Sequence, residues 1–132
     1  MHPRLLLDVS LADLAFATTS LATARDGDRY AARVEELFAP GRSLACLSIR
    51  SGFDALLEAL ALPAGSEVLF SAITIPDMPR VATLHGLVPV PVDLDPDTLA
   101  PRLDALQRAC TPKSKVLVVA HLFGGRVALA PY

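Results

Sequence analysis

Residues 43–70, SLACLSIRSGFDALLEALALPAGSEVLF, alternate between two kinds of pattern. The apolar run Ser43–Ile49 predicts a short buried strand, because strands covered on both faces are continuously apolar. Gly52 begins a helical pattern that runs to about Leu60, and Pro63-Ala64-Gly65 ends it. Glu67–Phe70 predicts a second strand. Strand, helix and strand joined by short connections indicate a parallel sheet with right-handed crossovers.

The same alternation continues along the rest of the chain. Pro76 suits the first turn of a helix that runs to about His85, and Gly86 suits its C-terminal cap. Val88–Val92 predicts a third strand, which its two prolines place at a sheet edge. Pro101–Cys110 predicts a helix, and Lys115–His121 a fourth, very apolar strand. The fold class is therefore α/β, a three-layer α/β/α arrangement around a mostly parallel sheet.

The N-terminal part has helical patterns only. Ser10 is a good N-cap for a helix over residues 10–24, and a second helix is expected over Asp28–Phe38, ended by Pro40-Gly41. Asp8 and Asp13 interrupt the apolar residues of the N-terminus, which argues against a signal peptide. Residues 1–40 are thus expected to form a helical segment, and residues 41–132 an α/β unit with four strands.

Composition limits the classes of function. The chain of 132 residues is 52% hydrophobic, with a formal charge of −2, a pI near 5.8 and a mean hydropathy of +0.44. A disordered chain would have the opposite balance, and without a basic face nucleic acid is not an expected partner. No apolar stretch reaches the roughly 18–20 residues of a membrane helix. A cytoplasmic protein is expected, with Cys46 and Cys110 as reduced thiols in or near the core.

Ligands of open parallel sheets bind beyond the carboxyl ends of the strands. Four connections leave those ends, at residues 50–54, 71–76, 93–97 and 122–125. Ser51-Gly52 lies between a predicted strand and a helix, where backbone N–H groups can hold a phosphate. From this motif alone, an ordinary helix start with Ser51 as N-cap is favoured over a phosphate site. In Val92–Asp97, VDLDPD, a turn and helix cap is favoured over a cation site.

Other common sites are not indicated by the sequence. The histidines, His2, His85 and His121, have no ligand spacing, so no zinc site is expected. His121 ends a predicted strand on the ligand side, where a site role and a partly buried structural role are both open. No Ser-His-Asp signature, Walker loop or GxGxxG sequence is present.

The order of these segments resembles the DegT/DnrJ/EryC1/StrS aminotransferases, fold-type I enzymes that use pyridoxal phosphate (PLP) and often aminate keto-sugars. The resemblance covers about residues 28–132. It rests on an ordered set of four motifs: RSGFDALLEAL, EVLFSAITIPDM, VPVPVDLDPDTLAPRLDAL and TPKSKVLVVAHLFGG. Each motif alone has low specificity. The resemblance implies that residues 41–132 are part of a PLP-transferase large domain.

The resemblance also implies cofactor-binding residues. Backbone amides of Gly52, Phe53 and Asp54 would hold the PLP phosphate, Ile75 would lie against the pyridine ring, and His121 matches the family's strand-end histidine. Two positions depart from the family pattern. Phe53 stands where the family has a threonine hydroxyl, and Ile75 where it has an aromatic ring, so ring cover is smaller.

The family's acidic residue for the pyridine nitrogen and its Schiff-base lysine match no residue of the chain. Lys113 and Lys115, the only lysines, lie at the start of the fourth strand, about 13 Å or more from its carboxyl end. We therefore expect an N-terminal aminotransferase portion that is inactive alone, with no metal and no assigned catalytic residue. A complementary chain or a homologous subunit is the expected partner. A non-catalytic interaction module and an unrelated phosphate- or nucleotide-binding α/β domain are the alternatives.

Overall fold

The computed structural model describes residues 9–23 and 27–132, in two compact units, Met1–Ala45 and Cys46–Tyr132. The boundary lies five residues after the expected one at residue 40. His2 and Asp8 lie outside the described residues.

The first unit contains two helices whose ends were expected from the sequence. α1 spans Leu11–Thr23 and α2 spans Gly27–Phe38. Ser10 caps α1, because its hydroxyl accepts a hydrogen bond from the Asp13 amide at 3.2 Å and the Asp13 carboxylate accepts one from the Ser10 amide at 2.8 Å. After α2, the Ser43 hydroxyl donates to the Glu35 carbonyl at 2.8 Å. None of the described residues between 9 and 45 is buried.

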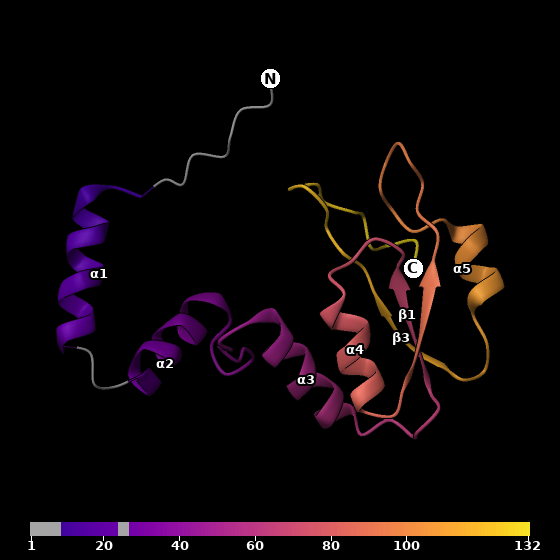
Figure 1. Ribbon diagram of the computed structural model, residues 1–132, viewed down its shortest axis with the longest axis horizontal. Coiled ribbons are helices and arrows are strands. Elements are labelled where there is room, and N and C mark those ends of the chain that lie inside the picture. Colours follow the sequence, from indigo (N-terminus) through magenta and orange to yellow (C-terminus); the bar gives the residue numbers. More distant parts are fainter. Residues whose placement is uncertain (1–8, 24–26) are drawn as a thin grey trace. The chain divides into compact units, whose positions relative to one another are not determined.

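The second unit is built on a three-stranded parallel sheet in the order β2-β1-β3. β1 spans Glu67–Ser71, β2 Val88–Val92 and β3 Ser114–Val118. Figure 1 shows α4, Asp77–Leu84, on one side of this sheet and α5, Leu103–Ala109, on the other. The structure confirms the α/β class and the three layers. β3 ends three residues before the expected His121.

The two faces of β1 explain the layers. Val68 and Phe70 pack with α4 and with α3, which spans Ile49–Leu60, and Leu57 of α3 is only 2% exposed. Leu69, between them, points to the opposite face and packs with Val92 and α5. Alternate side chains of one central strand thus form two small cores.

The prolines of β2 lie at the sheet edge, as predicted. The Val88 amide donates to the Ser66 carbonyl and the Ala72 amide donates to the Val92 carbonyl, both at 2.9 Å. Residues 88, 90 and 92 therefore direct their backbone groups toward β1. Pro89 and Pro91 face the open edge, where the missing N–H costs nothing in ladder bonds.

The strand predicted at Ser43–Ile49 is wrong. Residues 43–48 are irregular, and Ile49 already belongs to α3, three residues before the expected start at Gly52. Leu47 is 103% exposed. A strand needs a neighbour for its backbone hydrogen bonds, and no described strand pairs with this segment. The sheet thus has three strands where four were expected.

Candidate functional site

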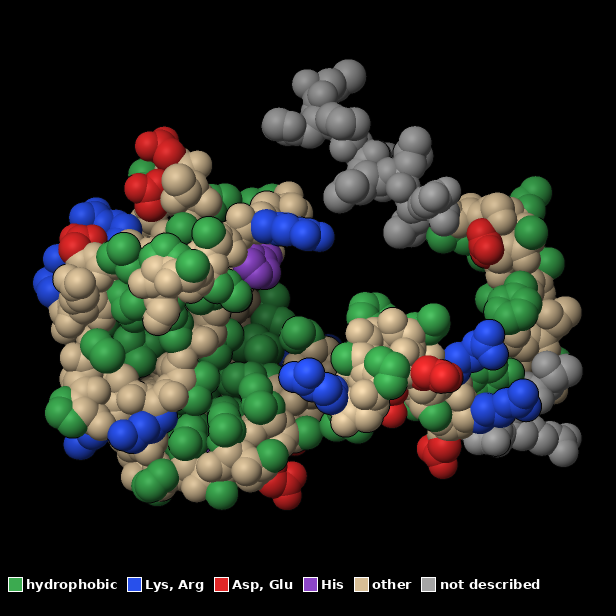
Figure 2. All heavy atoms as spheres, turned by 180° about the vertical axis from the view of Figure 1, so that it is seen from behind, with side chains coloured by type: hydrophobic (Ala, Val, Ile, Leu, Met, Phe, Trp, Pro, Cys, Tyr) green, Lys and Arg blue, Asp and Glu red, His purple; other side chains and the backbone are tan. Residues whose placement is uncertain are grey.

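An apolar cavity of about 600 Å³ lies at the carboxyl ends of β1 and β3. We call it the Ile75 pocket. Its lining comes from the first residue of α3, from the β1–α4 connection and from the chain after β3: Ile49, Ile73–Ile75, Met78 and Val118–Phe123. Figure 2 shows how widely apolar side chains cover the visible face of this unit. A pocket of this size and composition suits a small ring-containing ligand.

Two of the four predicted connections meet in this pocket. Residues 71–76 contribute Ile73, Thr74 and Ile75, and residues 122–125 contribute Leu122 and Phe123. Phe123 adopts φ 52° and Gly124 φ 80°, so the chain turns sharply after His121. The structure thus brings together Ile75 and His121, two residues that the sequence singled out.

Asp93–Asp97 does not line the pocket. The Asp95 carboxylate accepts hydrogen bonds from the Asp97 amide at 3.0 Å and the Thr98 amide at 2.9 Å. The bonds from the Thr98 amide and hydroxyl, and then from Asp97, lower the pKa of Asp95 because they stabilise its charged form. The turn predicted for this segment is confirmed. In the part of the chain that the structure describes, no group of three or more His, Cys, Asp or Glu side chains could hold a metal.

The proposed phosphate-binding amides lie inside α3. Ser48, not Ser51, is the N-cap, and its hydroxyl accepts a hydrogen bond from the Ser51 amide at 3.1 Å. The Gly52 amide donates to the Ser48 carbonyl at 3.0 Å. The N–H groups without intrahelical acceptors therefore belong to the first residues of α3, Ile49 and Arg50. The interpretation of Ser51 as N-cap was wrong because the helix starts earlier.

Phe53 and Asp54 point to different surroundings. Phe53 is 7% exposed and its ring meets Phe70 edge-to-face, with centroids 6.1 Å apart. Asp54 is exposed and lies 2.7 Å from His85 Nε2. Their side chains thus belong to the α3 packing surface and to a contact with the end of α4.

His121 has a defined ring orientation. Its Nδ1 accepts a hydrogen bond from the Val127 amide at 3.1 Å. A neutral histidine with Nδ1 as acceptor carries its proton on Nε2. His121 can therefore present an Nε2–H donor to a ligand in the Ile75 pocket.

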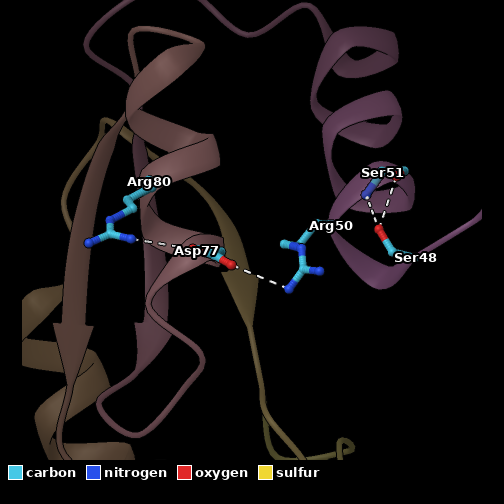
Figure 3. A network of polar contacts seen from close by, with 5 residues as sticks. All are labelled: Ser48, Arg50, Ser51, Asp77 and Arg80. Carbon is cyan, nitrogen blue, oxygen red and sulfur yellow. Dashed lines mark hydrogen bonds and ion pairs between the residues drawn. The ribbon is translucent and has the colours of Figure 1, made fainter.

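A charged group that links the starts of α3 and α4 was missed by the sequence reasoning. Arg50 Nη1 lies 3.3 Å from one oxygen of Asp77, and Arg80 Nη1 lies 3.4 Å from the other. Figure 3 shows Arg50 reaching from the start of α3 to Asp77 at the start of α4. Asp77 and Arg80 are three residues apart on one helix, a spacing visible in the sequence. The link from Arg50, 27 residues away, has no sequence signal.

Neither cysteine forms a disulfide, and both are exposed rather than in the core as predicted. Cys46 lies in the irregular segment that was taken for a buried strand, and Cys110 follows the end of α5. Among the described residues, no helix has the length and apolarity needed to cross a membrane.

The family model for the DegT/DnrJ/EryC1/StrS aminotransferase family matches residues 16–131. A related protein, L-glutamine:2-deoxy-scyllo-inosose aminotransferase of Micromonospora echinospora, is 36% identical over 96 residues, which cover 72% of this chain and 23% of that protein. The protein of the same name from Streptomyces kanamyceticus is 40% identical over 83 residues, 59% of this chain and 19% of its own. The chain therefore spans about a fifth of the length of these curated relatives.

Solved structures show the same fold. The sugar aminotransferase CalS13 from Micromonospora echinospora matches with a TM-score of 0.73 and 27% identity, over 92% of this chain and 35% of that one. The PLP form of Spr1654 from Streptococcus pneumoniae matches with a TM-score of 0.69 and 28% identity, over 87% of this chain and 31% of that one.

Proposed function

The chain belongs to the DegT/DnrJ/EryC1/StrS aminotransferase family, and from that premise we propose that it forms the N-terminal portion of a PLP-dependent aminotransferase. The whole enzyme would transfer an amino group from an amino acid to a keto-sugar or a similar carbonyl compound. The sugar aminotransferases among the matched proteins support this substrate class. Family membership argues against an unrelated phosphate- or nucleotide-binding domain.

The observation that carries the proposal is the position of the Ile75 pocket. It combines an apolar surface at the carboxyl ends of parallel strands with a helix start and the Nε2–H of His121. A flat pyridine ring suits the apolar surface, and an anionic group suits the start of α3. The residues present thus fit PLP, which when bound would supply the electron-withdrawing ring that transamination requires.

In this arrangement each residue has a physical role. With PLP bound, Ile75 would cover the ring, His121 would donate a hydrogen bond from Nε2, and the amides at the start of α3 would hold the phosphate. Gly52, Phe53 and Asp54 could contribute amides only if the first turn of α3 unwound, because the Gly52 amide is already bonded to Ser48.

Residues 1–132 alone are proposed to bind the cofactor without forming a covalent Schiff base with it. Lys113 precedes β3 and Lys115 is its second residue, whereas the pocket begins only at Val118. The Lys115 ammonium donates to the Pro112 carbonyl at 2.9 Å, at the opposite end of the strand. Neither lysine can reach the pocket while β3 is folded.

A partner is proposed at the free edge of β3. The open edge of β2 is occupied by Pro89 and Pro91 and cannot extend a ladder on that side. β3 contains no proline and is only half-buried, so its edge can accept another strand. A complementary chain or a homologous subunit that adds a strand here would also enclose the Ile75 pocket.

The test is to titrate the purified chain with PLP, reduce the mixture with borohydride and locate any label by mass spectrometry. We expect saturable binding without stoichiometric labelling of Lys113 or Lys115, and no amino transfer from L-glutamine. An Ile75→Asp variant should bind PLP at least tenfold more weakly, because a charge replaces the apolar ring contact. Unchanged affinity in Ile75→Asp, or stoichiometric labelling of either lysine with turnover, would contradict the proposal.

A further inference from the structure

Arg50 directly follows a residue that lines the Ile75 pocket. Its neighbour Ile49 lines the pocket from α3, and Met78, the neighbour of Asp77, lines it from α4. The 3.3 Å contact between Arg50 and Asp77 therefore joins the starts of the two helices that contribute Ile49 and Met78 to the pocket, and Figure 3 shows this contact. Arg50 and Asp77 belong to two different helices, α3 and α4, and 16 residues of the chain lie between the end of α3 and the start of α4.

The charges of this group are not balanced. Two guanidinium groups, of Arg50 and Arg80, approach the single carboxylate of Asp77. Asp77 is favourably placed in the first turn of α4, but Arg50 occupies the first turn of α3, where the helix dipole disfavours a cation. An anion bound beside Arg50 would remove that conflict.

The ion pair with Asp77 does not by itself explain why an arginine stands at position 50. The side chains of Arg50 and Asp77 are 54% and 44% exposed, and ion pairs that exposed contribute little to stability. Asp77 also keeps Arg80 as a partner at 3.4 Å if Arg50 moves. Arg50 is thus free to exchange one anion for another.

Phe53 cannot supply the hydroxyl that the family's threonine would offer to a phosphate at this position. Its ring is committed to the contact with Phe70, so that position offers no polar group to a phosphate. The guanidinium of Arg50 can supply two parallel N–H donors to phosphate oxygens, next to the amides of Ile49 and Arg50.

From these contacts we infer that Arg50 binds the phosphate of the cofactor, and that Asp77 is its partner when no phosphate is present. The inference rests on the proposed function and adds a phosphate-binding residue to it. Asp77 competes with the ligand for the same guanidinium, and Arg80 holds Asp77 in place.

The experiment measures the affinity of the full chain for pyridoxamine 5′-phosphate and for pyridoxamine by calorimetry. Neither compound has the aldehyde that reacts with lysines, and their affinity ratio reports the phosphate alone. We expect Arg50→Gln to lower this ratio about tenfold, since a charge-assisted hydrogen bond is lost. Asp77→Asn should raise it two- to fivefold, because Arg50 loses its competing carboxylate.

Arg108→Gln is the matched control, because Arg108 forms a similar exposed pair with Asp104 at 2.9 Å on α5. It should leave the ratio unchanged. Thermal unfolding of each variant, followed by circular dichroism, shows that the fold is retained.

The two variants are expected to change the affinity ratio in opposite directions, and this distinguishes phosphate binding by Arg50 from a purely structural role. If Arg50 only joined the helices, Arg50→Gln and Asp77→Asn would change the ratio in the same direction or not at all, and the inference would be overturned. If wild type binds both amines equally, the inference fails while the ring site of the proposed function stands. If wild type binds neither amine, both fail.

Discussion

Both units of the chain are rich in apolar side chains but use them differently. In Cys46–Tyr132, α3, α4 and β1 bury residues such as Leu57 and Val68 in a common core. In the described residues 9–45, α1 forms with a good N-cap at Ser10, yet side chains of α2 such as Leu37 and Phe38 stay exposed. Local signals are enough to form a helix, whereas burial needs a second surface that fits.

The largest expected effect tests this difference directly. Leu57→Ala should lower the free energy of unfolding by about 2–5 kcal/mol, because it leaves a cavity between α3 and the sheet. Leu37→Ala, at a side chain that is 78% exposed, should change it by less than about 0.5 kcal/mol. Urea unfolding followed by circular dichroism measures both. Equal losses would mean that the helices of residues 9–45 have a core of their own.

A buried hydroxyl gives the next effect. Ser71 is almost fully buried; its hydroxyl donates to the Val118 carbonyl at 3.2 Å and accepts from the Ala120 amide at 2.9 Å. Ser71→Ala should cost about 1–3 kcal/mol, since it removes two hydrogen bonds to the partly buried backbone of Val118 and Ala120. The same unfolding measurement applies, with Thr83→Ala, an exposed hydroxyl on α4, as the control. A loss no greater than that of the control would show that water replaces these bonds.

A serine hydroxyl caps one helix in each unit, α3 at Ser48 and α1 at Ser10. Ser48→Ala should cost about 1 kcal/mol in cooperative unfolding, because α3 is part of the core. Ser10→Ala removes an equivalent cap from α1 and should reduce helicity without moving the main unfolding transition. A shift of that transition by Ser10→Ala would join α1 to the cooperative unit.

The smallest effect depends on pH. Hydrogen bonds from the Thr111 and then the Ser114 hydroxyl lower the pKa of Glu67 below its usual value. A lowered pKa in the folded state contributes stability that is present above the unfolded pKa and lost as the pH falls through the folded pKa. As the pH is lowered past about 4.3, the melting temperature of wild type should therefore decrease more steeply than that of Glu67→Gln. Parallel curves for the two proteins would show that Glu67 adds nothing.

Short-range patterns were sufficient for most elements. Pro89 and Pro91 placed β2 at an edge, Gly86 ended α4, and Ser10 started α1, because each depends on backbone geometry within a few residues. The family was also readable, since an ordered set of weak motifs is far more specific than any one of them. Ile75 and His121, which the resemblance singled out, both line the Ile75 pocket, because both follow strands and strand ends meet at one edge of a parallel sheet.

Ser43–Ile49 and the start of α3 were decided by tertiary structure. An apolar run becomes a strand only where a neighbour accepts its backbone hydrogen bonds, and without one Ser48 caps a helix that begins three residues early. The contact between Arg50 and Asp77 likewise depends on how two helices pack. The sequence by itself determined the class of fold, the family and the order of strands along the chain. Only the packed structure decided which backbone amides are free and which charges meet, because both depend on contacts between residues far apart in the chain.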